Sequence, residues 1–216
     1  MKRAVLFDMD GVIFDSERAV LAVWREIAGE MELSGIDGVF VQCVGVNKQR
    51  TREIFCEAYP DLNFDEFDVR VRRLFLSRYD KGRLPVKPGV REILAGLRER
   101  RIPLALASST RTETVKRELE EAGFLGCFDT VIGGDLVTRS KPDPEIFLTA
   151  ASRLGAEPAD CFVIEDSFNG IRAASAGGFR PIMVPDMLPP DAEMEEKAEL
   201  IAADLFEAWD YLQKKL

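Results

Sequence analysis

The sequence has no histidine among its 216 residues. Histidine is the side chain that most often moves protons near neutral pH, so any acid–base chemistry must use carboxylates, lysine, tyrosine or cysteine. The sequence also lacks a run of Lys or Arg, and its net charge is −9. Nucleic acid and anionic membranes attract basic surfaces, so we expect neither as a partner. A small molecule is the expected partner.

Paired cysteines and long apolar runs are missing as well. Cys43, Cys56, Cys127 and Cys161 include no C-x-x-C pair, so they predict neither a disulfide framework nor a zinc site. We expect them to be reduced core residues of a cytosolic protein. No apolar run approaches the ~20 residues of a membrane-spanning helix. The first strand is expected to begin by Ala4, which leaves no room for a signal peptide. These features predict a soluble, cytoplasmic protein.

The chain is long enough for one main core and a small additional domain. After residue 84, helical and strand patterns alternate, which is typical of βαβ units around a parallel sheet. The strands expected there lie within residues 102–109, 128–134, 161–167, 180–185 and 199–204. The last segment, which runs to Leu216, is expected to be a closing helix. The predicted fold class is α/β, with a Rossmann-like core of three layers and a parallel sheet.

Residues 16–84 have a different pattern, with helical periodicity and no convincing strand. The residues that mark the clearest two helices are Val20, Val23, Trp24 and Ile27, and then Phe67, Val71, Leu74 and Phe75. Stretches near 37–44 and 49–58 are also compatible with helices. We therefore expect a helical cap domain at 16–84, inserted into a catalytic core of residues 1–15 and 85–216. Such a cap could open and close over a site.

The stretch VLFDMDGV at residues 5–12 is an apolar strand that ends in two aspartates, Asp8 and Asp10. In an extended chain, residues two apart point to the same face, so both carboxylates would point to one place. Asp and Gly also favour turns, and the pair alone is equally compatible with a simple turn. The other strand ends must decide between the two interpretations.

In open parallel sheets, ligands bind beyond the carboxyl ends of the strands. The strand within 102–109 delivers Ser108, the loop after 128–134 leads to Lys141, and the strand within 161–167 delivers Glu165 and Asp166. Taken singly, Lys141 could be a surface lysine, and Glu165 and Asp166 could be solvated loop acids. Their coincidence at corresponding strand ends favours a common site.

Ser108 could also cap the helix that follows it. Thr110 and Glu113, however, have the S/T-x-x-E spacing of a capping box. We expect this box to start the helix, which leaves Ser108 available for function.

Four carboxylates gathered at one sheet edge would raise one another's pKa and destabilise the site unless a cation lies among them. Oxygen ligands without His or Cys are those that Mg²⁺ prefers, and Mg²⁺ in proteins often completes its coordination with substrate phosphate. The expected cofactor is therefore Mg²⁺, and the expected substrate is an anion that bridges to it.

Four motifs, in this order, carry a family resemblance: FDMDGV with Asp8, ASS with Ser108, SKPDPEIF with Lys141, and IEDSFNG with Glu165 and Asp166. Together they resemble the haloacid dehalogenase superfamily, in particular its phosphatases and phosphomutases with a helical cap after the first strand. Each motif alone is weak, but the ordered set covers the core from end to end.

The resemblance implies a catalytic role for each motif. Asp8 would attack phosphorus and form an aspartyl-phosphate. Asp10 would protonate the leaving oxygen and then deprotonate the water that hydrolyses the intermediate. Ser108 and Lys141 would hold the transferring phosphoryl group.

The resemblance also implies a metal site. The carboxylates of Asp8 and Asp166 and the backbone carbonyl of Asp10 would bind Mg²⁺, with Glu165 as a further or water-mediated ligand. The implied activity is Mg²⁺-dependent hydrolysis of a small phosphomonoester, such as a sugar phosphate or related metabolite.

Two alternatives remain open. β-Phosphoglucomutase resembles the chain at residues 1–15, 104–109 and 140–147, but it uses a cap histidine about twelve residues after its nucleophile. The chain has Val20 near that position and no histidine, which favours a phosphatase over a mutase. The second alternative is a phosphate- or metal-binding protein without turnover.

Substrate selection is expected in the cap. CVGVNKQRT at 43–51 resembles the cap loop that touches substrate in relatives, so Lys48 or Arg50 would bind a second anionic or polyhydroxyl group. For either residue alone, a solvated helix start is a slightly better explanation. The resemblance favours a monomer, and no feature identifies the particular phosphomonoester.

Overall fold

The computed structural model describes residues 3–46 and 48–216. Its centre is a six-stranded sheet in the order β3-β2-β1-β4-β5-β6, and every neighbouring pair is parallel. The strands are β1 (Ala4–Phe7), β2 (Leu104–Ser108), β3 (Thr130–Gly133), β4 (Cys161–Glu165), β5 (Arg180–Met183) and β6 (Leu200–Ile201). Each strand lies in a segment where the sequence predicts one, so the predicted parallel sheet is confirmed.

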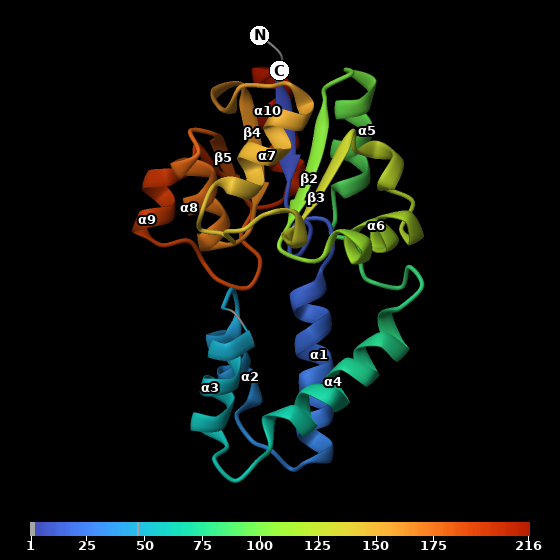
Figure 1. Cartoon of the computed structure of the whole chain (residues 1–216), viewed down its shortest axis with the longest axis vertical. Helices are drawn as coiled ribbons and strands as arrows, with labels where there is room; N and C mark the ends of the chain where they lie inside the picture. Colours follow the sequence, from blue (N-terminus) through green and yellow to red (C-terminus); the bar gives the residue numbers. More distant parts are fainter. Residues whose placement is uncertain (1–2, 47) are drawn as a thin grey trace.

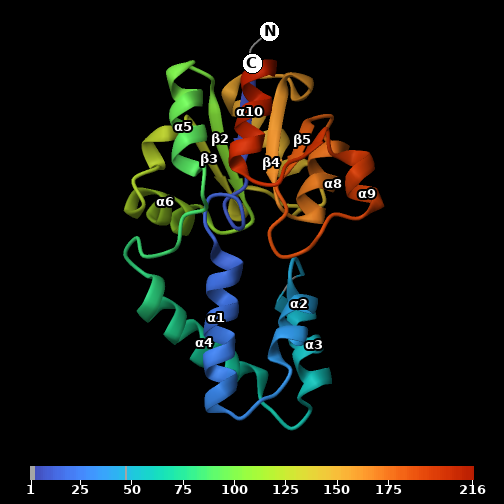
Figure 2. The same cartoon turned by 180° about the vertical axis from the view of Figure 1, so that it is seen from behind.

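The sheet is covered by helices on both faces, because β1 alternates the direction of its apolar side chains. Ala4 and Leu6 pack with one buried cluster, and Val5 and Phe7 pack with the other. Helices α7 and α8 cover the first face, while α5 and α10 cover the second (Figures 1 and 2). The bounds of these helices are Val90–Glu99 for α5, Glu145–Leu154 for α7, Phe168–Ala176 for α8 and Leu205–Lys215 for α10. The result is the predicted three-layer α/β fold.

Two further helices differ from the sequence expectation. Helix α6 (Thr112–Glu121) begins two residues after Thr110, so the predicted capping box is wrong. Instead, the backbone N–H of Thr112 donates to the Asp135 carboxylate over 2.6 Å. Helix α9 (Ala192–Lys197) is not predicted at all. It is too short for a periodic pattern, and Met194 is its one buried residue.

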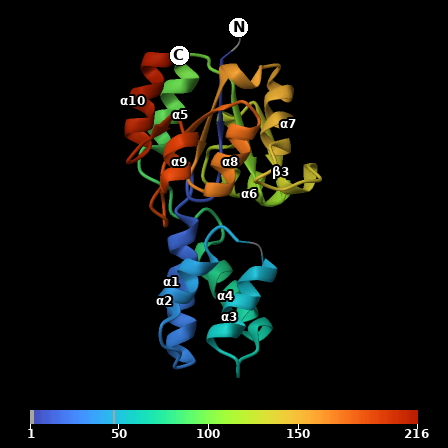
Figure 3. The ribbon, with the colours of Figure 1, turned by 90° about the vertical axis from the view of Figure 1, so that its left-hand side faces the viewer.

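Helices α1 to α4, called the cap helices below, lie beyond the carboxyl ends of the strands (Figures 1 and 3). They span Ser16–Glu30, Ile36–Cys43, Lys48–Ala58 and Phe64–Tyr79. Their hydrophobic cluster is separate from the two that cover the sheet. Trp24 lies within it, with its ring centroid 5.0 Å from that of Phe67 and 5.2 Å from that of Phe40. The helices lie where the sequence predicts them, and the limits of the cap domain stay a prediction.

The chain passes from the sheet to the cap helices and back again, and one buried aspartate binds residues at both of these crossings. The Asp186 side chain is fully buried, and its Oδ1 accepts hydrogen bonds from Lys87 Nζ over 2.6 Å and from the Arg18 guanidinium. Arg18 also pairs with Asp15 at 3.1 Å. Asp15 lies on the first crossing, Arg18 in the first turn of α1 and Lys87 on the second crossing, so the Asp186 carboxylate links the start of the cap to both crossings.

All four cysteines are free thiols, but only Cys161 is buried, so the expectation of core positions fails for the other three. None of the helices in residues 3–46 and 48–216 is long and apolar enough to cross a membrane. The cytoplasmic location and the monomeric state stay predictions.

Candidate active site

The site lies where three neighbouring strands end together. β1 is the central strand, and its Phe7 is in register with Leu106 of β2 and Ile164 of β4. The backbone N–H of Asp8 still donates to the Ile164 carbonyl, over 3.0 Å. The residues that leave these three strands therefore emerge side by side. The sheet register explains why motifs more than 150 positions apart in the sequence meet at one edge.

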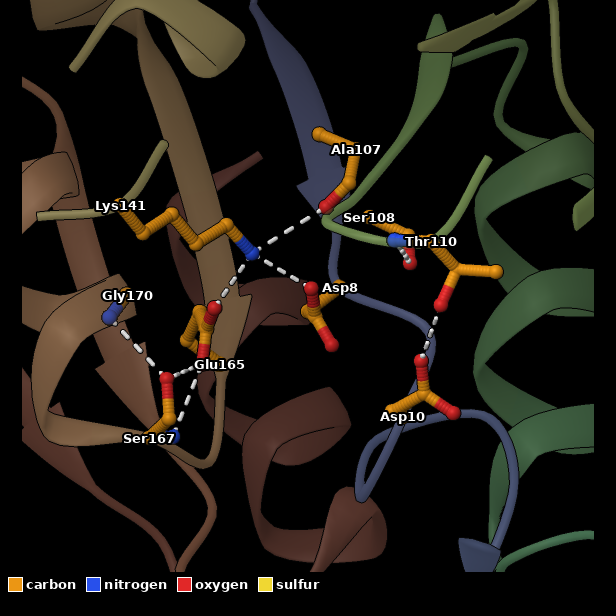
Figure 4. A network of polar contacts seen from close by, with 9 residues as sticks. All are labelled: Asp8, Asp10, Ala107, Ser108, Thr110, Lys141, Glu165, Ser167 and Gly170. Atoms are coloured by element: carbon orange, nitrogen blue, oxygen red, sulfur yellow. Dashed lines mark hydrogen bonds and ion pairs between the residues drawn. The ribbon is translucent and has the colours of Figure 1, made fainter. Parts of the chain in front are cut away.

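Lys141 joins the ends of β1 and β4. Its Nζ donates to Asp8 Oδ1 over 2.5 Å and to Glu165 Oε1 over 2.6 Å, and it approaches the Ala107 carbonyl at 3.3 Å (Figure 4). The exposed fraction is 6% for the Lys141 side chain, 9% for Asp8 and 1% for Glu165. The interpretations of Lys141 as a surface lysine and Glu165 as a solvated acid are therefore wrong.

Glu165 is held from both sides. Its Oε2 accepts from the backbone N–H of Ser167 at 2.8 Å and from the Ser167 hydroxyl at 2.9 Å, while Oε1 accepts from Lys141. Gly170 makes room for it, because a Cβ there would lie 1.8 Å from Glu165 Oε1. Both oxygens are thus engaged, Oε1 with Lys141 and Oε2 with Ser167. The predicted role of Glu165 as a metal ligand remains untested, and these contacts favour a positioning role.

Asp10 and Ser108 are connected through Thr110, which the sequence predicts as part of a capping box. The Thr110 hydroxyl donates to Asp10 Oδ2 over 3.2 Å, and its backbone N–H donates to Ser108 Oγ over 3.1 Å (Figure 4). Ser108 is 1% exposed. The end of β2 thereby fixes the orientation of the Asp10 carboxyl.

Burial dominates the electrostatics of the acidic groups. It raises the pKa of Asp8 to about 7 even though the Lys141 ammonium lowers it. Burial also raises the pKa of Asp10, and together with the charges of Glu165 and Asp8 it raises the pKa of Asp166 well above its ordinary value. For Lys141, burial alone would lower the pKa, but the Asp8 and Glu165 carboxylates raise it overall. The site is a desolvated cluster of acids that a cation would stabilise.

The donor set suits Mg²⁺. Within the described part of the chain, no group of three or more His, Cys, Asp or Glu residues could hold a metal ion. The set predicted for Mg²⁺ needs only two carboxylates, those of Asp8 and Asp166, with the backbone carbonyl of Asp10 as the third donor. Asp166 lies against this backbone, because a Cβ on Gly11 would be 2.2 Å from Asp166 Oδ2. An oxygen-only set of this kind fits the preferences of Mg²⁺.

A cavity of about 840 Å³ opens over these groups. Its wall combines residues of the sheet edge, including Asp8, Asp10, Lys141 and Asp166, with cap residues that include Glu17, Gly45 and Arg50. The cavity therefore lies between the strand ends and the cap helices.

The two cap residues predicted to bind substrate differ in position. Arg50 lines the cavity and also pairs with Glu53 at 3.0 Å. Lys48 does not line it, and its Nζ pairs with Asp68 at 2.7 Å within the cap. Asn47, in the same segment, lies outside the described residues. The geometry thus favours Arg50 over Lys48.

The sequence does not predict several other residues that line the cavity, among them Glu17, Asn169 and Arg172. Burial, with the nearby charges of Asp10 and Asp186, raises the pKa of Glu17 to about 7. Its place in the first turn after the chain crossing was a usable signal. Asn169 and Arg172 follow the IEDS motif on α8, and no local pattern separates them from ordinary helix residues.

Comparison with known proteins agrees with the motif order. The family model of the haloacid dehalogenase-like hydrolases matches residues 2–178. The chain is 34% identical to the phosphorylated carbohydrates phosphatase of Thermotoga maritima, over 83% of each protein. It is 30% identical to the β-phosphoglucomutase of Bacillus subtilis, over 96% of each.

Other matches differ in extent. The chain is 30% identical to a bifunctional riboflavin kinase/FMN phosphatase of Arabidopsis thaliana over 96% of its own length, but spans only 54% of that protein. A crystal structure from Thermotoga maritima, of a protein assigned as a β-phosphoglucomutase, superimposes with a TM-score of 0.82 at 30% identity and covers 100% of both chains. The sequence match and the shared fold together mean that this chain belongs to the haloacid dehalogenase-like hydrolase family.

Proposed function

We propose that the protein is a Mg²⁺-dependent phosphatase that hydrolyses a small sugar phosphate through an aspartyl-phosphate on Asp8. The observation that carries this proposal is the Asp8–Lys141 ion pair of 2.5 Å at the base of the cavity. A buried lysine that keeps its proton favours the ionised form of Asp8, which is the form that can attack phosphorus.

The reaction has two steps. An Asp8 carboxylate oxygen attacks phosphorus, the bond from phosphorus to the sugar oxygen breaks, and Asp10 gives its proton to that oxygen. Water then attacks the phosphorus of the aspartyl-phosphate, Asp10 takes the proton from the water, and the bond from phosphorus to Asp8 breaks to release phosphate. The raised pKa of Asp10 supports its role as the acid in the first step.

The phosphoryl group would be bound by Ser108 and Lys141 beside Asp8. Phosphoryl transfer depends mainly on positioning and on stabilising negative charge on the phosphoryl oxygens. Mg²⁺ bound by Asp8, Asp166 and the Asp10 carbonyl would supply further positive charge there. Glu165 and Ser167 keep Lys141 in place, and Thr110 keeps Asp10 in place.

The cavity supports a sugar phosphate as the substrate. Its volume of about 840 Å³ leaves room for a leaving group beyond the phosphoryl site, and Glu17 and Arg50 supply polar contacts on the cap side. The name of the Thermotoga maritima relative points to the same class, phosphorylated carbohydrates.

A mutase is the second candidate, because the B. subtilis relative with that activity aligns along nearly the whole chain. Val20, near the position expected for a cap histidine, cannot transfer protons and packs against the cap cluster. This favours the phosphatase.

The test is a screen of phosphorylated metabolites with and without Mg²⁺, read by ³¹P NMR, with Asp8→Asn as the control for contaminating activity. We expect Mg²⁺-dependent release of inorganic phosphate from hexose or hexitol phosphates. Interconversion of glucose 1- and 6-phosphates without release would establish the mutase. If no compound is turned over, including p-nitrophenyl phosphate, the remaining hypothesis is a phosphate- or metal-binding protein without catalytic activity.

A further inference from the structure

A direct polar contact joins the sheet side of the cavity to the loop between the cap helices α2 and α3. Asn169, in the first turn of α8, donates from Nδ2 to the backbone carbonyl of Gly45 over 3.3 Å. Gly45 belongs to the loop 44–46, called the cap loop below, which leads from α2 toward α3. Both residues line the cavity. Figure 1 shows the α2–α3 end of the cap next to α8 and the loop that follows β5.

The orientation of the Asn169 amide is fixed by its other contact. Arg172 Nη1 donates to Asn169 Oδ1 over 3.2 Å. A guanidinium can only donate and a carbonyl can only accept, so the amide oxygen must face Arg172 and the amide nitrogen must face Gly45. Arg172 is in turn held by Glu193 of α9, with Nε donating over 2.9 Å. A chain of contacts thus runs from α9 through α8 to the cap loop.

An apolar contact accompanies this polar chain. Met187, in the loop after β5, packs against the hydrophobic cluster of the cap helices and also lines the cavity. Among the described residues, the Asn169 hydrogen bond and the Met187 side chain therefore both join the sheet side to the cap near the cap loop. Arg50 lies in the first turn of α3, shortly after the cap loop, and lines the same cavity as Gly45.

We propose that Asn169 is a positioning residue that clasps the cap loop to the core and thereby places Arg50 for the leaving group. The inference rests on the proposed function for its effect on substrate. The clasp itself does not depend on turnover. In this proposal α9 also helps to fix the shape of the cavity, because its Glu193 holds Arg172 and Arg172 orients Asn169.

The first test measures the clasp without substrate. Asn169→Asp keeps the acceptor for Arg172 but loses the donor to Gly45 and places a negative charge near that carbonyl. We expect amides of the cap loop to exchange with deuterium about 2- to 10-fold faster, the range for loss of one hydrogen bond. Asn63→Asp is the matched control, because Asn63 caps α4 as an acceptor from Asp65 N–H and Asp keeps that role.

Unchanged exchange in the cap loop of a folded Asn169→Asp protein would overturn the clasp, whatever its effect on activity. If that variant fails to fold, Arg172→Met gives the same readout, because it leaves Asn169 in place but frees its amide to rotate. Faster exchange confined to the cap loop supports the proposal in either variant.

The second test asks whether the clasp acts through Arg50. For the sugar phosphate found in the screen, we expect Asn169→Asp to raise KM in the wild-type background and to add little in an Arg50→Ala background. Independent, multiplying effects on KM would mean that Asn169 contacts substrate directly, and would overturn the positioning role. If no sugar phosphate is hydrolysed, the proposed function fails, while deuterium exchange still decides the clasp.

Discussion

The two walls of the cavity are built differently. On the sheet side, Asp8, Lys141 and Glu165 are buried and bonded to one another. On the cap side, Arg50 keeps more than half of its side-chain surface exposed and pairs with Glu53 of the cap itself. Its neighbour Lys48, which does not line the cavity, is likewise more than half exposed and pairs with Asp68. The groups at the sheet edge thus hold one another in place, whereas these charged groups of the cap pair within the cap. The difference agrees with the proposal that the core carries out the reaction and the cap selects the substrate.

The largest expected effect on activity is that of Asp8→Asn. Removing the nucleophile should lower kcat/KM by at least about 10⁴-fold, as knockouts of catalytic nucleophiles do. Lys141 keeps its ion pair with Glu165, so the fold should remain. Steady-state phosphate release measures the loss of activity, and circular dichroism checks that the variant is folded. A folded variant with a tenth of the wild-type activity would exclude Asp8 as the nucleophile.

Two lysine substitutions compare the sheet side of the cavity with the cap. Lys141→Ala leaves Asp8 and Glu165 buried without their cation and should destabilise the protein by about 3–5 kcal/mol. Lys48→Ala breaks an exposed pair with Asp68 and should change stability by about 0–1 kcal/mol. Urea unfolding measures both. Equal effects would mean that the sheet side is no more tightly built than the cap side.

Mg²⁺ should bind the sheet side and stabilise it. At about 100 times its dissociation constant, a ligand of the folded state adds roughly 2.7 kcal/mol. We expect Mg²⁺ to raise Tm in the wild type and chelation to abolish activity. Asp166→Asn should remove most of the Tm shift. A full shift in that variant would place the metal elsewhere.

Arg50→Ala probes the cap side. Losing one charge-assisted contact should raise KM for the sugar phosphate about tenfold. Turnover of p-nitrophenyl phosphate, which has no sugar for the cap to bind, should change much less. Lys48→Ala is the matched control and should leave KM for both substrates unchanged. If Lys48→Ala raised KM and Arg50→Ala did not, Lys48 and not Arg50 would be the residue that binds the substrate.

The smallest effect concerns the loop before Lys141. Glu145 accepts backbone N–H bonds from Thr138 and Arg139, with Thr138 contributing most, and these lower its pKa from 4.5 to about 2. A lowered carboxyl pKa stabilises the folded state above the unfolded value of 4.5, and this contribution is lost as pH falls toward 2. The Tm difference between wild type and Glu145→Gln should be full at neutral pH and vanish near pH 2. A pH-independent difference would contradict this account.

The sheet side of the cavity could be predicted from the sequence because a parallel sheet delivers the ends of its strands to one edge. Each predicted residue lies at the end of an apolar strand or in the segment that follows one, and periodicity locates those strands. These residues are Asp8, Ser108, Lys141 and Glu165. Which hydrogen bonds they form could not be predicted. Thr110 was assigned to a helix cap, although its hydroxyl binds Asp10.

The cap side could not be predicted in the same way. Lys48 and Arg50 are two positions apart on one helix, roughly 200° around its axis, so only the packing of the cap decides which one faces the cavity. Asn169 and Gly45 are 124 positions apart in sequence and meet only because the cap lies over the sheet. Such contacts leave no local pattern.

The most direct test of the account is whether Asp8 becomes phosphorylated. Asp10→Asn should still be phosphorylated by p-nitrophenyl phosphate, whose leaving group departs without a proton, but should hydrolyse the intermediate slowly. We predict a burst of p-nitrophenolate equimolar with the protein and, after acid quenching, a phosphoryl group on the peptide that contains Asp8. Absence of both the burst and the phosphopeptide, with Mg²⁺ present and the fold intact, would contradict the proposed mechanism.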